Sequence, residues 1–225
     1  MKKILTVLLI ITLSLTLLLT ALENNAYNKA YYLNQFEQNN TVEETGKTME
    51  ELSIIADDLI DYIKGKGFDP LLVPHFNDKE IAHMRDVQNL FDSGRALKFI
   101  SGGIALILLI YFGVNEGKRK LGKKLFFGLF ANHIVIALLA VIISSNFNKY
   151  WTMFHHIFFI NDLWLLDPKT DLMIQMLPEQ FFSGMVVRIM LSFFIYLSII
   201  QIAGLYYMKK GREGWKDLRN TRKDI

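Results

Sequence analysis

The chain has 225 residues, of which 52% are hydrophobic and 21% are charged, and it contains no cysteine. The lack of cysteine excludes disulfides, cysteine-ligated zinc, iron–sulfur clusters and a cysteine nucleophile. A formal net charge of +3 is too small to indicate a nucleic-acid partner. The charges gather in clusters between long uncharged stretches, which excludes intrinsic disorder and favours a membrane protein over a water-soluble domain.

Four stretches are long and apolar enough to cross a bilayer, which takes about 20 residues of helix. The first, 1–22, has a basic start and so resembles a signal peptide, but its apolar part exceeds the ~7–15 residues of a signal core. We therefore predict an uncleaved helix there. The other three predicted spans are 96–114, 125–144 and 181–208.

Basic residues predict the orientation of these spans. They precede the first span at Lys2 and Lys3, fill the connection 115–124, and recur in the tail 209–225. With four spans, all three segments fall on one side, which the positive-inside rule assigns to the cytoplasm. Both termini are then cytoplasmic. The predicted class is an all-α membrane protein with four transmembrane helices and an extracellular cap, formed by two outer segments, 23–95 and 145–180.

The first outer segment contains two helix starts. Thr48 and Glu51 form a capping box ahead of an amphipathic helix that Lys64 and Gly65 close. Asn77 suits the N-cap of a second helix, with Glu80 at its third position, and this helix runs through His83 towards the second span. We expect the fold of 23–47 to bring Tyr27, Tyr31 and Tyr32 to line the cap.

The second outer segment is unusually aromatic. Aromatic side chains suit the membrane interface, but that role leaves His155 and His156 unexplained, as well as the acidic residues that follow them. Asp167 before Pro168 predicts a helix N-cap, and Pro178 predicts the start of the last span.

The five histidines have different expected roles. His133, inside an apolar span, is expected to make a structural hydrogen bond, and His75 lies in a Pro-flanked loop where we expect it to be solvated. His83 and Asp86 share one helix face. His155 and His156 point in different directions, so at most one serves a given site. The chain has no His-Glu-x-x-His and no serine in a nucleophile elbow, so we expect neither a metal nor an acyl-enzyme.

Two stretches resemble the bacterial lipoprotein intramolecular transacylase (Lit) family. One is Phe76-Asn-Asp-Lys-Glu-Ile-Ala-His-Met-Arg-Asp-Val87. The other is Phe154-His-His-Ile-Phe-Phe-Ile-Asn-Asp-Leu-Trp-Leu-Leu-Asp-Pro168, continuing through Asp171 to Phe182. The four-span layout follows the same order over the whole chain.

The resemblance implies a multi-pass protein of the bacterial cell membrane. It implies transfer of the sn-2 acyl chain of a diacylglyceryl-cysteine lipoprotein to the α-amino group of that cysteine, with no cofactor. The expected partners are this lipoprotein and membrane lipids, and no nucleic acid. The matching motifs make His83 and His155 the implied catalytic pair, and they leave open which of the two is the base.

Other residues are candidates for supporting roles in that reaction. Three carboxylates could orient an imidazole and two arginines could steady an oxyanion: Asp86, Asp162, Asp167, Arg85 and Arg188. Four aromatic residues are expected to form a box around the substrate and exclude water: Phe154, Phe158, Phe159 and Trp164.

The alternative is a non-enzymatic membrane sensor or assembly partner. Its acidic outer segment and amphipathic helix would then bind another protein. The short tail with no recognisable signalling module counts against this interpretation.

Overall fold

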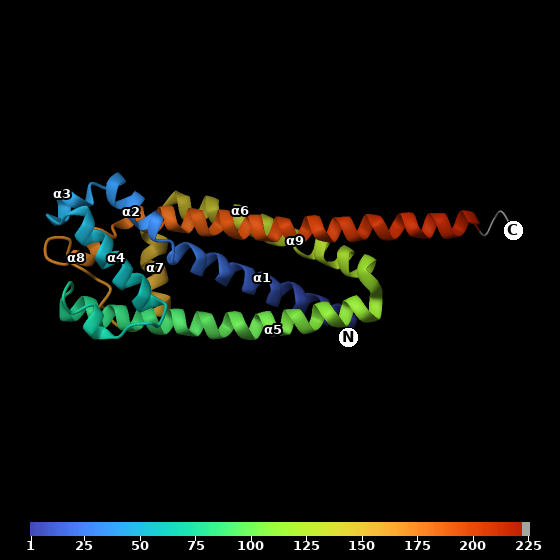
Figure 1. Cartoon of the computed structure of the whole chain (residues 1–225), viewed down its shortest axis with the longest axis horizontal. Helices are drawn as coiled ribbons and strands as arrows, with labels where there is room; N and C mark the ends of the chain where they lie inside the picture. The colour runs from blue at the N-terminus through green and yellow to red at the C-terminus, as the bar shows by residue number, and fades with distance from the viewer. Residues whose placement is uncertain (222–225) are drawn as a thin grey trace. The chain divides into compact units, whose positions relative to one another are not determined.

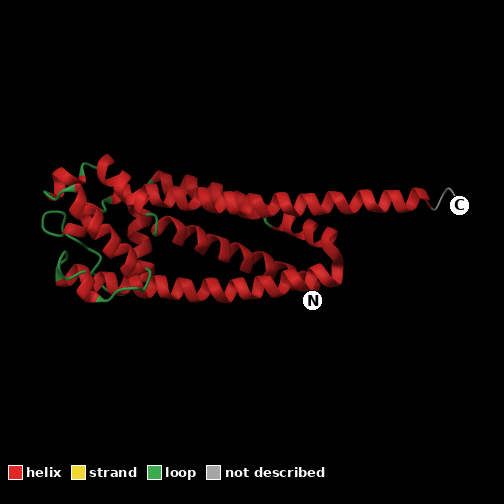
Figure 2. Cartoon of the chain, viewed as in Figure 1, coloured by secondary structure: helices red, strands yellow, loops and turns green. Residues whose placement is uncertain are grey.

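The computed structural model describes residues 1–221 of the chain, with side chains described up to residue 210, and this part consists of helices joined by loops, the longest of which comprises residues 159–171 (Figures 1 and 2). The predicted tail 209–225 ends outside the described residues. The elements in order are α1 (Lys2–Ala26), α2 (Lys29–Gln38), α3 (Thr41–Thr45), α4 (Met49–Ile63), a 3₁₀ turn (Asp69–Leu71), α5 (Asp78–Gly128), α6 (Phe130–Ser145), α7 (Phe147–Phe158), α8 (Leu172–Met176) and α9 (Glu179–Thr221).

These elements form two compact units. One, which we call the span unit, comprises 1–21, 97–140 and the chain from 190 onward. The other, which we call the site unit, comprises 22–96 and 141–189. Each unit combines segments far apart in the sequence, so long-range packing defines both.

Three helices of the described chain are long and apolar enough to cross a membrane: Lys2–Ala26, Asp78–Ser145 and Glu179–Lys210. The second contains both 96–114 and 125–144, which we predicted as separate spans. The connection 115–124 is helical except at Gly117, whose φ of 80° and ψ of 159° interrupt α5. The chain folds back there, because Lys124 Nζ lies 4.5 Å from the Phe112 ring centre.

Polar and small residues join the helices of the span unit. His133 Nε2 lies 3.2 Å from Ser198 Oγ, which confirms the predicted structural hydrogen bond. Thr16 and Ser101 share another hydrogen bond of 2.9 Å. A Cβ on Gly122 would lie 2.5 Å from a backbone oxygen of α9, so this contact requires glycine. Such contacts are typical of helices that pack within a membrane.

The core of the site unit is built on α4. Thr48 and Glu51 form the predicted capping box, the helix ends before Lys64, and Gly65 adopts a φ of +74°. The apolar face of α4 is buried with side chains from α2, α8 and the start of α9: Leu52, Ile55, Leu59, Tyr62, Tyr31, Tyr32, Phe36, Met173, Met176, Phe181 and Met185. The prediction for α4 is confirmed, and Tyr31 and Tyr32 lie in this core.

Two local predictions are wrong. Asp167 does not cap a helix, because its carboxylate accepts from the backbone of Lys169 in a turn and α8 begins only after Asp171. His75 is not simply solvated, since its Nε2 lies 2.8 Å from Asp58 Oδ2 and the pair is partly buried. For His75, the partner is a carboxylate 17 residues away in the sequence, which local patterns do not reveal.

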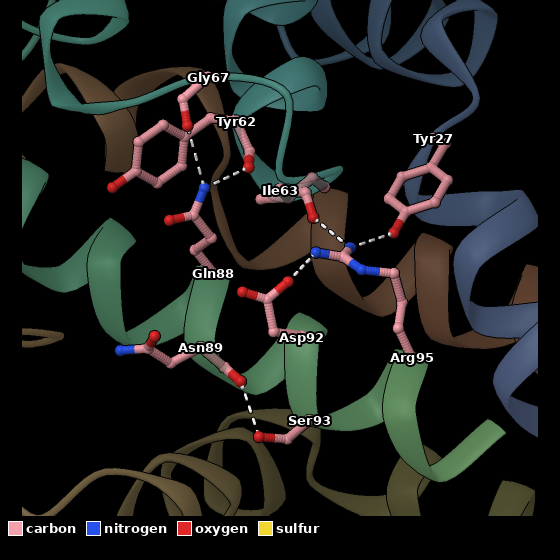
Figure 3. Close-up of polar contacts among 9 residues, drawn as sticks. All are labelled: Tyr27, Tyr62, Ile63, Gly67, Gln88, Asn89, Asp92, Ser93 and Arg95. Carbon is pink, nitrogen blue, oxygen red and sulfur yellow. Dashed lines mark hydrogen bonds and ion pairs between the residues drawn. The ribbon is translucent and has the colours of Figure 1, made fainter. Parts of the chain in front are cut away.

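The first turns of α5 are fastened to the end of α4 (Figure 3). Gln88 Nε2 donates to the carbonyl oxygens of Tyr62 and Gly67, at 2.8 Å and 3.3 Å. Arg95 Nη1 donates to the carbonyl oxygen of Ile63 at 2.7 Å and to the hydroxyl of Tyr27 at 2.9 Å. The bond to Ile63 satisfies a carbonyl at the end of α4, and the four bonds together hold the helix that carries His83 against this end of α4.

Candidate functional site

Two histidines from distant parts of the sequence meet in the site unit. His83 lies on the second turn of α5 and His155 near the end of α7, and their ring centres are 6.1 Å apart. Both are buried, with 8% and 7% of their surface exposed. The neighbouring His156 is exposed, as expected for residues that follow one another on a helix.

Aromatic side chains enclose this histidine pair. Trp164 stacks on His155 with ring centres 4.7 Å apart, and Trp151 meets it edge-on at 4.8 Å. Phe159 contacts both imidazoles, at 5.3 Å from His83 and 5.6 Å from His155. The pair therefore sits in an apolar and largely dry environment.

The sequence of α7 explains how His155 is placed. Asn146 caps the helix by accepting from the backbone of Lys149, and Trp151 and His155 lie four residues apart on one face. His155 Nδ1 lies 2.8 Å from the carbonyl oxygen of Trp151. A carbonyl only accepts hydrogen bonds, so Nδ1 carries the hydrogen. In neutral His155, the lone pair that can take a proton is then on Nε2.

Burial keeps both imidazoles neutral. It lowers the pKa of His83 from 6.5 to about 4, with His155 acting in the same direction and the Asp86 carboxylate opposing. Burial also lowers the pKa of His155, against the hydrogen bond to Trp151, and His156 lowers it further. Both imidazoles are therefore neutral at pH 7 and carry a lone pair that can accept a proton.

A buried carboxylate fixes the start of α5, one turn before His83. Glu80 is 1% exposed, and its two oxygens accept from the backbone of Met173 at 2.7 Å and of Asn77 at 2.8 Å. Asn77 Nδ2 in turn donates to Asp171 Oδ1 at 3.0 Å. The predicted capping box at Asn77 and Glu80 is present and also ties α5 to the segment before α8.

A pocket of about 250 Å³ opens beside the histidine pair. One wall is a single face of α5 and the other is the end of α7 with the residues that follow: Asp86, Asn89, Leu90, Ser93, Phe158, Phe159, Ile160 and Asn161. Phe159 belongs both to this wall and to the box around the histidines, so the pocket and the box adjoin each other at the Phe159 ring.

Comparisons with known proteins identify the family and the fold. A family model described as lipoprotein intramolecular transacylase Lit matches residues 7–182. This chain belongs to the Lit family. A solved structure of membrane-integral Lit from Bacillus cereus, in meso, has a TM-score of 0.85 at 25% identity and covers 94% of this chain and 97% of its own. Two variants of that protein, with one histidine replaced by arginine or alanine, have TM-scores of 0.81 at 25% identity, covering 94% of this chain and 94% and 95% of their own. No curated protein matches.

Membership of the Lit family and the three apolar helices make this chain a membrane protein. The family name also makes it an acyltransferase with a lipoprotein substrate. Among the residues with described side chains, no three His, Cys, Asp or Glu side chains are grouped as metal ligands.

The structure brings some of the predicted site residues of this Lit protein together and not others. His83, His155, Phe159 and Trp164 share the box, and Phe154 packs at its edge, 5.5 Å from His155. Phe158 packs against Phe154 with tilted rings whose centres are 4.8 Å apart, and it is half-exposed at the pocket wall.

The charged candidates lie at various places in the site unit. Asp86 lines the pocket and accepts from Asn161 Nδ2 at 2.9 Å. Asp162 and Asp167 are exposed. Arg85 is held 2.6 Å from Asp69, and the Arg188 guanidinium lies 5.0 Å from the Tyr31 ring centre.

Three residues of the site were missed from the sequence. Trp151 is not among the predicted site residues, although its position four residues before His155 on a helix indicates contact. Glu80 is predicted only as part of a local helix cap, and nothing in the sequence indicates that it also binds residue 173. Asn161 is not among the predicted site residues either.

The lowered pKa of His83 predicts a loss of stability in acid. Because the unfolded protein binds a proton at His83 below pH 6.5 and the folded protein does so only near pH 4, folding becomes less favourable as the pH falls through this window. The contribution is about 2 kcal/mol by pH 5. We expect His83→Gln to reduce the fall in melting temperature between pH 7 and pH 5, measured in detergent by tryptophan fluorescence.

The control is His156→Gln, because His156 is exposed and lies outside the buried pair, so its replacement should change the pH dependence much less than His83→Gln does. Equal pH dependence in His83→Gln and the unmodified protein would contradict a buried neutral His83.

Proposed function

We propose that this Lit protein moves the sn-2 acyl chain of a diacylglyceryl-cysteine lipoprotein to the α-amino group of the same cysteine. The product is a lyso-lipoprotein with an N-acyl chain. The observation that carries the proposal is a buried, neutral histidine pair enclosed by aromatic side chains, with a pocket at its edge.

The substrate supplies both the nucleophile and the ester, so the enzyme only has to move protons and position the reacting atoms. The α-amino group has a pKa of ~7.7–8.0 and starts mainly as an ammonium. Forming the amide removes two protons from this nitrogen, and breaking the ester returns one proton to the sn-2 oxygen. One proton is therefore released for each transfer, and two imidazoles suffice to handle both.

We assign the steps as follows. One proton leaves the ammonium for His83, and the free amine attacks the ester carbonyl to form the C–N bond. His155 Nε2, whose lone pair is free, takes the second proton from nitrogen. Protonated His83, a strong acid because of its low pKa, gives its proton to the departing glyceryl oxygen as the C–O bond breaks. His155 then returns its proton to water, and no acyl-enzyme forms.

The aromatic box supports transfer over hydrolysis. Attack by the amine closes a large ring, so positioning contributes more than acid strength. Trp151, Phe159 and Trp164 surround the imidazoles and leave little room for water, which would otherwise compete for the ester.

We also propose the membrane topology predicted from the basic residues. Gly117 divides the long apolar helix into two spans, which gives four in all. Both termini are then cytoplasmic, and the histidine pair acts at the outer side, where lipoproteins are anchored.

Mass spectrometry of a lipoprotein's N-terminal lipopeptide, with and without expression of this protein, tests the proposal. We expect one acyl chain to shift from glycerol to nitrogen at unchanged total mass. A gain of a whole chain would mean transfer from another lipid. No change would overturn the proposal and favour the sensor interpretation. EDTA should leave the shift intact.

A further inference from the structure

The pocket beside the histidines has one charged residue in its lining, Asp86. The other polar groups, on Asn89, Ser93 and Asn161, are neutral. The pocket is therefore a negatively charged recess, and the ligand group that complements it electrostatically is a cation.

Asp86 is held in place by a residue from the opposite wall. Asn161 Nδ2 donates to Asp86 Oδ2 at 2.9 Å, and Asn161 is anchored in turn because its Oδ1 accepts from the backbone of Leu163 at 3.1 Å. One carboxylate oxygen is thus engaged by the protein, and the carboxylate still has acceptor capacity for a ligand. A fixed carboxylate loses less entropy on binding than a mobile one.

The position of Asp86 relates the cation to the chemistry. Asp86 follows His83 by three residues on α5, so both side chains lie on one helix face, and its negative charge opposes the lowering of the His83 pKa. A cation bound at Asp86 would lie next to the imidazole that takes its proton.

The rim of the pocket is apolar and exposed. Of the apolar lining residues, Ile160 is fully exposed and Phe158 is 51% exposed. A pocket with a charged wall and an apolar rim suits an amphiphile whose polar head is cationic. At about 250 Å³ it is smaller than the pockets that enclose drug-sized ligands, so it fits a head group without its acyl chains.

We propose that Asp86 binds the α-ammonium group of the substrate's N-terminal cysteine, and that Asn161 positions Asp86 for this contact. The inference rests on the proposed function, which supplies a substrate with an obligatory ammonium group. It gives Asp86 a role in recognising the substrate, in place of the predicted role of orienting an imidazole.

The test measures binding, so it does not depend on catalysis. The probes are two dialkylglyceryl-cysteine tetrapeptides whose ether chains cannot be transferred, one with a free α-amine and one N-acetylated. We expect the purified protein in detergent to bind the free-amine form about tenfold more tightly, the size of one charge-assisted hydrogen bond. In Asp86→Asn this preference should be lost. Asp86→Glu should retain part of it, and Asn161→Ala should reduce it.

Asp78→Asn is the matched control, because Asp78 is an exposed aspartate on the same helix and should leave the preference unchanged. An undiminished preference in Asp86→Asn would overturn the inference, even if acyl transfer occurs. If Asp86→Asn does not fold, the other two variants decide. The inference would then be overturned if both Asn161→Ala and Asp86→Glu kept the full preference for the free-amine probe. A preference that depends on Asp86, in a protein that transfers no acyl chain, would support the binding site and contradict the proposed function.

Discussion

His83→Ala and His155→Ala are each expected to lower the rate of acyl transfer by at least about a hundredfold, because each removes a proton-transfer group worth ~10²–10⁴-fold. The double variant should be little worse than either single one, since the two imidazoles act in one sequence of proton transfers. The measurement is the initial rate of N-acyl product formation by purified protein on a synthetic diacylglyceryl lipopeptide.

The control is His156→Ala, which changes the neighbouring but exposed histidine. We expect it to retain most of the activity, because its ring meets the outer side of Trp164 edge-on at 5.1 Å and lies outside the buried pair. If His156→Ala is inactive and His155→Ala is active, then His156, and not His155, is the catalytic residue.

Glu80→Ala is expected to destabilise the site unit by about 2–4 kcal/mol, because it leaves the buried backbone N–H of Met173 without a partner, removes the capping bond to Asn77 and creates a cavity. Burial raises the pKa of Glu80, against the hydrogen bonds from Met173 and Asn77, and Asp171 raises it further. The carboxylate is thus stabilised mainly by those two bonds. The measurement is the melting temperature by fluorescence, to which Trp151 and Trp164 contribute from inside the site unit.

Glu51→Ala provides a matched control for this prediction. Glu51 occupies the same capping-box position at the start of α4 but is exposed, so water can replace it and the shift should be much smaller. Equal shifts for the two variants would show that Glu80 acts only as a local helix cap.

Local signals in the sequence predicted the helices of the site unit well. The start of α4 follows from Thr48 and Glu51 and its end from Gly65, because capping bonds and a positive φ depend on residues within one turn. The start of α9 after Pro178 follows in the same way. These features require no knowledge of the rest of the chain.

Long-range pairs could not be predicted in this way. The bond between Glu80 and Met173 joins residues 93 positions apart, and the pairs His75–Asp58 and Asp86–Asn161 are of the same kind. Each depends on how helices pack, which no spacing along the chain encodes. The prediction that Asp167 caps a helix was wrong for a different, local reason: the N-cap residue of α8 is Asp171, one turn further on.

The histidine pair could be predicted only in part from the sequence. The sequence motifs singled out His83 and His155, and the structure adds that both are buried among aromatic rings while His156 is exposed. The helical repeat of α7 separates the adjacent histidines by about 100°, which is why only one of them can face His83.

The most direct test of the central claim follows the acyl chain itself. A synthetic diacylglyceryl lipopeptide with an isotopically heavy sn-2 chain is incubated with the purified protein and an excess of unlabelled phospholipid, and fragmentation mass spectrometry then locates the label. We expect the heavy chain on the α-nitrogen of the same peptide, at unchanged total mass. An unlabelled chain on nitrogen, or a heavy chain on a second peptide, would contradict an intramolecular transfer.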